Sequence, residues 1–212
     1  MALTSDVQRA WLEGGVKIVV ARSLKRFVRP AVKVGSLVFT ECDLRKPLPE
    51  KPPIPGIVMR EAAPENAALF ENPALVAERL RLGYRCFMGI EEATGKLANY
   101  RWISTSTAYF PELKRRLILK PDEAYAFDLN TIPEFRRRGI DSYTRYYTYS
   151  YLRDSGFNKI YAYIHGDNVA SLTASRLFLK PIGRVWYIQP RGFEPLMIGG
   201  RGERFPELKH EQ

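Results

Sequence analysis

A short basic loop between a predicted strand and a predicted helix constrains the fold of this chain most strongly. Residues Ala124 to Thr131 are rich in aromatic and branched side chains, which predicts a strand. Pro133 ends that strand, because proline donates no ladder hydrogen bond. Residues Asp141 to Asp154 carry tyrosines at helical spacing, which predicts a helix. The loop Arg136 to Ile140 joins the two elements, so it lies at the N-terminus of a helix.

A loop of this kind is suited to holding a diphosphate. Backbone amides at a helix N-terminus point outward, the helix dipole favours negative charge, and a glycine such as Gly139 allows a phosphate to approach closely. The chain then continues with a predicted strand, Lys159 to His165, and a predicted helix that begins with Asn168 to Ser171. This order of elements predicts an α/β fold.

The segment Pro133 to Ile140 (PEFRRRGI) resembles the signature of the GNAT acyltransferase superfamily, Arg/Gln-x-x-Gly-x-Gly/Ala, which binds the pyrophosphate of acyl-CoA. Arg136 and Gly139 match the signature, whereas Asp141 stands where a small residue is usual. The resemblance covers about residues 57–198. It implies the GNAT fold, a mixed and mostly antiparallel sheet with a central strand splay and flanking helices, and it implies acetyl-CoA as the cofactor.

The resemblance also implies which residues hold the coenzyme. The pyrophosphate would lie against one run of main-chain amides: Arg136, Arg137, Arg138, Gly139, Ile140 and Asp141. Leu129 and Thr131 would bind the pantetheine through their backbones, and Asn168 through its side chain, although a helix cap is the alternative for Asn168. Many GNAT enzymes carry a tyrosine seven residues beyond this asparagine, near the thioester sulfur, and Ser175 occupies that position here.

Acyl transfer to an amine needs a base, because only the neutral amine attacks the thioester. Asp128, on the strand that enters the loop, is the predicted catalytic base, and strand alternation places it on one face with Ala126 and Asn130. An acid inside a strand is costly unless it is paired or solvated, so a salt bridge with a neighbouring arginine is the alternative. Glu123 is a second candidate base, and His165 is either catalytic or a structural histidine.

Composition limits the other classes of function. Two cysteines and two histidines indicate neither a disulfide scaffold nor a metal site. The net charge of +10 is spread along the chain without aromatic–basic alternation, so no nucleic-acid partner is expected. We find no secretory signal and no apolar run of about 20 residues. A cytoplasmic protein is therefore predicted, with peripheral contact at the inner face of the membrane as an alternative.

The predicted organisation has four parts. Residues 1–35 form a basic helical extension, residues 36–55 a proline-rich linker, residues 56–200 the GNAT domain and residues 201–212 a polar tail. Within the linker, Val38 to Cys42 could add a short strand. Within the extension, residues 6–29 read as a basic amphipathic helix. Its apolar stripe could pack on the domain, on a second subunit in a homodimer, or on an anionic membrane.

The resemblance implies an N-acyltransferase that moves acetyl or another acyl group from acyl-CoA to a small primary amine, with an amino sugar or an envelope-related amine as the suggested acceptor. Three alternatives stay open. One is a catalytically silent acyl-CoA sensor or scaffold, and another is a membrane-surface adaptor. The third is an enzyme that takes its acyl group from a carrier protein or an aminoacyl-tRNA, to which positive charge would help it dock.

Overall fold

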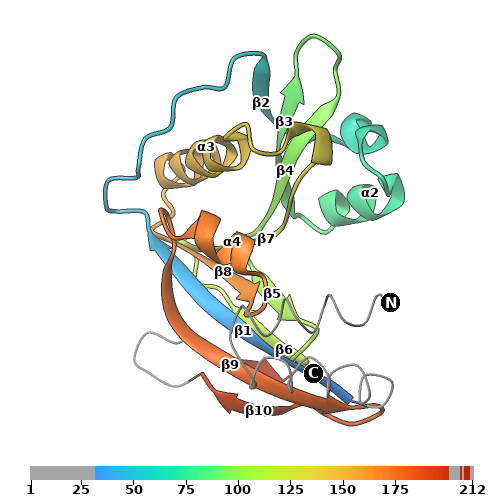
Figure 1. The fold of residues 1–212 in the computed structure, drawn as a ribbon, viewed down its shortest axis with the longest axis vertical. Helices are drawn as coiled ribbons and strands as arrows, with labels where there is room; N and C mark the ends of the chain where they lie inside the picture. Colours follow the sequence, from blue (N-terminus) through green and yellow to red (C-terminus); the bar gives the residue numbers. More distant parts are fainter. Residues whose placement is uncertain (1–31, 201–205, 207, 211–212) are drawn as a thin grey trace, which may run out of the picture.

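The computed structural model describes residues 32–200, 206 and 208–210 (Figure 1). Its strands are β1 (Val32–Asp43), β2 (Ile57–Glu61), β3 (Arg85–Glu91), β4 (Leu97–Ser104), β5 (Thr107–Phe110), β6 (Arg115–Ile118), β7 (Glu123–Thr131), β8 (Lys159–His165), β9 (Lys180–Pro190), β10 (Leu196–Gly199) and β11 (Lys209–His210). Its helices are the 3₁₀ turns η1 (Pro64–Leu69) and η2 (Pro133–Phe135) and the α-helices α2 (Pro73–Arg81), α3 (Ile140–Asp154) and α4 (Val169–Ser175). The strand, loop and helix predicted around Gly139 are all present.

One large sheet organises the fold. Its eight strands follow the order β10-β9-β1-β8-β7-β4-β3-β2, and β11-β6-β5 form a small second sheet. All neighbours in the large sheet are antiparallel except β7 and β8, which are parallel. The predicted mixed, mostly antiparallel sheet is therefore confirmed. The segment around residues 108–120, which the sequence left unassigned, forms the β5–β6 hairpin of the second sheet.

The two faces of the large sheet are covered by different elements, as Figure 1 shows for α3 and α2. Alternation along β3 sends Phe87 into a cluster with α3 residues, whereas Cys86 and Met88 pack with η1 and α2. Near the other end of the sheet, the β5–β6 hairpin packs on β1, β8 and β9 through a cluster that includes Phe39 and Phe110. Both faces around the centre of the sheet are thus buried.

The predicted linker 36–55 and the predicted domain start at Gly56 are wrong in part. β1 pairs with β8 and with β9, so residues 36–43 of the predicted linker and residues 32–35 of the predicted helical extension lie inside the large sheet. Leu37, Val38 and Phe39 are almost completely buried, which explains why this stretch forms a strand. Only the proline-rich residues 44–55 form an irregular connection, which runs from β1 to the far edge strand β2 (Figure 1).

The predicted amphipathic helix at residues 6–29 lies outside the described residues. So does most of the predicted polar tail, although β11 near the C-terminus pairs with β6. Several exposed apolar side chains lie on paired positions of one sheet face: Val34, Trp186, Ile188, Leu196 and Ile198. No helix in the described part of the chain has the length and hydrophobicity that crossing a membrane requires.

Candidate active site

The parallel strands β7 and β8 separate in the middle of the sheet. They pair only over three positions, from Glu123 opposite Lys159 to Tyr125 opposite Tyr161. Beyond Tyr125, β7 continues against β4 and β8 continues against β1. This opening is the strand splay expected from the sequence. It leaves two strand edges without their usual ladder partner, and polar backbone groups at such edges can bind a ligand.

A β-bulge lies on β7 at the start of the splay. Tyr100 of β4 is opposite Asn130 and Trp102 is opposite Phe127, so β7 carries one extra residue. Asp128, within the bulge, has φ of 43°, in the left-handed region. Because the bulge interrupts strand alternation, the predicted common face of Ala126, Asp128 and Asn130 is wrong. Ala126 packs in the cluster beneath α3, whereas Asp128 and Asn130 lie on the α2 side.

Cavities lie on both sides of the splay. A cavity of about 260 Å³, called the splay cavity below, lies between β7, β8, α3 and α4. A second cavity of about 400 Å³ lies under the β5–β6 hairpin and next to α2, and it shares four wall residues with the splay cavity: Tyr125, Phe127, Asp128 and Tyr163. A third, of about 850 Å³, runs along η1 and α2. Asp128 lines all three, so ligands entering from opposite faces could meet beside it.

Asp128 is held by an arginine that the sequence analysis did not identify. Arg79, in the last turn of α2, donates to the Asp128 carboxylate. The guanidinium of Arg79 lies 5.0 Å from the centre of the Trp102 ring and 5.3 Å from that of Phe127. The salt bridge weighed as the alternative for Asp128 is therefore present. The Asp128 side chain is still 38% exposed, so a ligand in the cavities can reach it.

The predicted phosphate loop begins α3 with unusual backbone angles. Gly139 caps the helix with φ of 76°, a conformation that glycine adopts without strain, and Arg137 has φ of 63°. The Ile140 side chain is buried against Ile57 and Phe135, so it anchors the first turn of α3. The loop is thus fixed from the protein side, and the exposed N-terminus of α3 offers amides to an anion.

The arginine side chains of this loop point to different partners. Arg136 Nε donates to the Thr131 carbonyl at 3.0 Å, so this oxygen is already engaged. The Thr131 hydroxyl accepts from Asn99 at 2.7 Å. Arg138 places its guanidinium 5.3 Å from the centre of the Phe135 ring. The side chains of Arg136 and Arg138 thus contact other groups of the protein.

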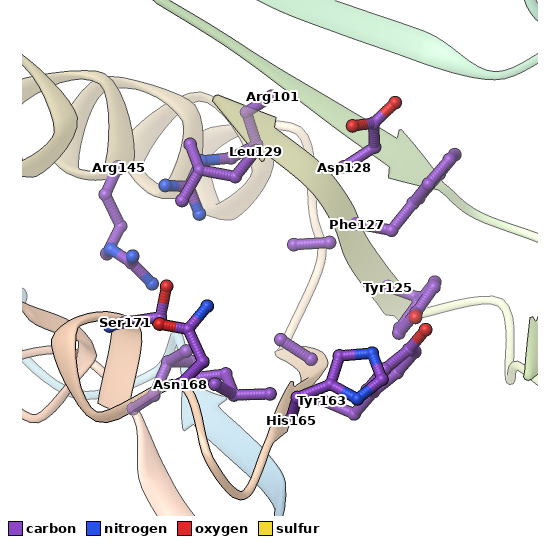
Figure 2. A pocket seen from close by; sticks show the side chains of 14 residues that line it. Arg101, Tyr125, Phe127, Asp128, Leu129, Arg145, Tyr163, His165, Asn168 and Ser171 are labelled. Carbon is purple, nitrogen blue, oxygen red and sulfur yellow. Dashed lines mark hydrogen bonds between the residues drawn. The ribbon is translucent and has the colours of Figure 1, made fainter. Parts of the chain in front are cut away.

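Asp141 faces the protein interior. Its carboxylate accepts from Arg101 Nη2 at 3.0 Å and from Arg145 Nη2 at 3.3 Å. Both arginines are almost fully buried and line the splay cavity (Figure 2). Burial, and then the neighbouring Arg145, lower the pKa of Arg101. The acid that departs from the GNAT signature is therefore a counter-ion for two buried cations.

Asn168 and Leu129 line the splay cavity on opposite sides (Figure 2). Asn168 Oδ1 accepts from the Ser171 amide at 3.1 Å, so the predicted helix cap is confirmed. Ser175, which occupies the position of the tyrosine in many GNAT enzymes, is buried and donates to the Leu172 carbonyl at 3.0 Å. Its hydroxyl is therefore engaged within α4.

The other two predicted candidate bases lie in different surroundings. Glu123 is buried at the start of β7, where its carboxylate accepts hydrogen bonds from the Lys120 amide and the Tyr161 hydroxyl. It therefore stabilises the turn before β7, and it lines none of the three cavities. His165 Nε2 lies 3.1 Å from Glu112 Oε1, and the Tyr163 hydroxyl donates to the other oxygen of Glu112. Burial, and then Glu112, raise the pKa of Tyr163.

The described residues hold no group of three or more acidic, histidine or cysteine side chains that could bind a metal ion. Cys42 and Cys86 are buried free thiols, and burial raises the pKa of Cys42 to about 11 and that of Cys86 to about 12. Neither thiol has the lowered pKa of a reactive nucleophile.

The fold is that of the GNAT acetyltransferases. A tandem GNAT protein from the clavulanic acid biosynthesis pathway superposes with a TM-score of 0.54 at 16% identity, over 80% of this chain and 58% of its own length. The GCN5-related N-acetyltransferase from Sphaerobacter thermophilus gives 0.54 at 12% identity, over 83% and 58%. The one from Kribbella flavida gives 0.51 at 15% identity, over 85% and 65%. No protein-family model and no curated protein matches the sequence.

At these identities the similarities show the fold and leave the activity and the substrates undetermined. The chain spans less than two thirds of the length of each of these three proteins. Sequence reasoning missed the residues that pair with its candidates: Arg79, Arg101, Glu112 and Arg145. Two of them carry a signal that could have been used. Arg101 interrupts an apolar strand, and Arg145 stands four residues after Asp141 on a helix, where side chains meet.

Proposed function

We propose that the protein transfers an acyl group, acetyl or a related acyl, from acyl-CoA to a primary amine. The observation that carries this proposal is the β7–β8 splay with a cavity on each face of the sheet and shared walls between them. Such an opening lets a thioester approach from the α3 side and an amine from the α2 side. Acetyl-CoA is the cofactor named by the proposal, and its pyrophosphate would lie on the loop from Arg136 to Asp141.

The residues present fit this coenzyme. The α3 N-terminus offers amides for the diphosphate, and the free β7 edge around Leu129 offers backbone groups for the pantetheine. Thr131 contributes its amide alone, since its carbonyl accepts from Arg136. Asn168 lines the same cavity, and its side-chain amide group can donate while its oxygen caps α4.

The chemistry would take place at the bulge. Asp128 would accept a proton from the acceptor amine, once Arg79 shares or releases its carboxylate. Backbone amides at the bulge would donate to the oxyanion that forms on the thioester carbonyl. When the oxyanion collapses, the carbon–sulfur bond would break and CoA would leave as a thiolate that takes a proton from water. Glu112 with His165 forms a second candidate base, because His165 and Tyr163 line the splay cavity and Tyr163 also lines the acceptor side.

The acceptor would enter between α2 and the β5–β6 hairpin. Phe127 and Tyr84 provide apolar walls there, and Asp128 provides a negative charge that would attract an ammonium group before it loses its proton. A small amine, such as an amino sugar or an envelope-related amine, is the proposed substrate class. Peripheral membrane contact through residues 6–29 and a homodimer are further proposals.

Isothermal titration calorimetry with acetyl-CoA tests the proposal by measuring whether the phosphate loop binds the coenzyme. We expect Gly139→Glu to abolish measurable binding, because it places a carboxylate where the diphosphate would lie and forces a left-handed backbone on a side chain. Gly83→Glu is the matched control, since Gly83 has φ of 81° with open space around it. No binding of acetyl-CoA by the unaltered protein, or equal binding by the Gly139 variant, would refute the proposal.

A silent acyl-CoA sensor is the second candidate, and Ser175 favours it because no tyrosine acid stands at that position. Turnover of acetyl-CoA with a panel of amines separates the two functions. Binding without turnover across amino sugars, polyamines and aryl amines favours the sensor, whereas turnover of any amine that falls with Asp128→Asn favours the enzyme.

A further inference from the structure

Two buried cations share one anion beside the splay cavity. Arg101, on β4, is 2% exposed, and Arg145, on α3, is 4% exposed. Both contact the same carboxylate, that of Asp141. Asp141 and the phenol of Tyr149 act on both guanidinium groups, Arg145 also acts on Arg101, and the neutral thiol of Cys42 lies near Arg145. Since a phenol is neutral near pH 7, the cluster carries an excess positive charge within the described residues.

An excess charge in this position is costly. A buried charge without a counter-ion loses its hydration. Cation–π contacts return only part of that loss: the Arg101 guanidinium lies 5.6 Å from the centre of the Tyr149 ring, and that of Arg145 lies 5.9 Å from the centre of the Phe178 ring. Hydrogen bonding is incomplete as well, because Nε of Arg101 and Nε of Arg145 are buried without a partner among the described residues. The Tyr149 phenol contacts Arg145 and carries no charge near pH 7, so it does not neutralise either arginine. Together these groups form a donor-rich wall that lacks acceptors.

This wall faces the place where the acyl group would lie. Arg101 stands on β4 between Tyr100 and Trp102, whose partners on β7 flank the bulge. Arg145 of α3 and Ser171 of α4 line the same cavity as the end of β8 (Figure 2). The remaining lining of this cavity includes no carboxylate other than Asp128, which is paired with Arg79 on the α2 side. Arg101 and Arg145 are the arginine side chains of this lining that a negative group in the splay cavity could contact.

We propose that the acyl donor carries a terminal carboxylate, as in a dicarboxylic acyl-CoA, and that Arg101 and Arg145 bind this carboxylate in the splay cavity. The inference rests on the proposed function, since it assumes that the thioester lies at the bulge. A carboxylate fits because guanidinium groups bind it with paired, charge-assisted hydrogen bonds. It would supply the second anion that the cluster lacks. A neutral acyl chain would leave both the charge and the donors uncompensated.

Calorimetry on the full chain with CoA, butyryl-CoA and succinyl-CoA tests this inference without a substitution. The two acyl groups have four carbons each and differ by the carboxylate. We expect succinyl-CoA to bind roughly ten- to a hundredfold more tightly than butyryl-CoA, the range that charged hydrogen bonds provide. Equal affinities for the two would overturn the inference and leave the proposed function standing. If none of the three ligands binds, the proposed function fails as well.

Arg145→Met then tests the named residue. We expect the preference for succinyl-CoA to fall to about threefold or less, and the affinity for butyryl-CoA to stay within about threefold of the original, because only the carboxylate loses its partner. Arg153→Met, on the exposed last turn of α3, is the matched control and should keep the full preference. An equal loss for CoA, butyryl-CoA and succinyl-CoA would mean that Arg145 serves the coenzyme itself, which contradicts the inference. If Arg145→Met does not fold, the comparison of ligands on the unaltered protein decides.

Discussion

Replacing Asp141 with asparagine should destabilise the protein strongly, although Asp141 lies at the surface end of a helix. The substitution removes the carboxylate that accepts from Arg101 and Arg145 and leaves two buried cations side by side. Breaking a fully buried ion pair costs about 3–5 kcal/mol. The Asp141 side chain is 25% exposed, so solvent screens part of this interaction. We therefore expect a loss of about 2–3 kcal/mol in the free energy of unfolding.

Urea denaturation followed by circular dichroism measures this loss, and thermal unfolding should show a decrease in Tm of about 4–10 °C for a chain of this size. The double variant Asp141→Asn with Arg145→Met tests the cause. If repulsion between the two guanidinium groups dominates, the double variant should lose less stability than the sum of the single variants, by about 1 kcal/mol or more. An Asp141→Asn variant within about 0.5 kcal/mol of the original protein would refute the reasoning, because it would show that the carboxylate is not the counter-ion of a buried charge.

Three further predictions concern the site and the chain end. Asp128→Asn should lower kcat about 100-fold or more, because the amine loses its proton acceptor. The KM for acyl-CoA should stay within about threefold of the original value, because coenzyme binding is unchanged. An unchanged kcat in steady-state kinetics would contradict this prediction. Glu112→Gln should lower kcat less than tenfold if Asp128 is the base, and the reverse order of effects would assign that role to the Glu112–His165 pair. If residues 1–31 pack on the domain, deleting them should lower Tm and increase the binding of a hydrophobic dye to the exposed face around Trp186. An unchanged Tm together with lost sedimentation on anionic liposomes would instead show that this segment binds the membrane.

Local sequence signals predicted the elements around the site well. Pro133, Gly139 and the tyrosine spacing that follows them define the end of β7 and the start of α3, because proline, glycine and helical periodicity act within a few residues. The hairpin of β3 and β4 follows from two mainly apolar segments on either side of a polar turn that contains glycine. The Asn168 cap likewise depends on a contact only three residues away.

Long-range pairing was beyond the reach of such signals. The strand at Val32–Asp43 was predicted only as a possible short strand at Val38 to Cys42, because its partners, β8 and β9, lie more than 100 residues further along the chain. The bulge at Asp128 is equally hidden, since it is defined only by the register of β7 against β4. For that reason, alternation along β7 alone placed Ala126 and Asp128 on a common face, which the structure contradicts.

The residue types by themselves determined that a basic, glycine-containing turn begins a helix after a strand, and this local chemistry suffices to predict an anion-binding loop. What surrounds that loop was decided by tertiary packing. Folding brings Arg101 from β4 to Asp141 and Arg145 on α3, and it brings Arg79 from α2 to Asp128. Charge compensation depends on distance in space, so an acid that looks unsuitable next to a phosphate in the sequence becomes the counter-ion of two buried arginines in the fold.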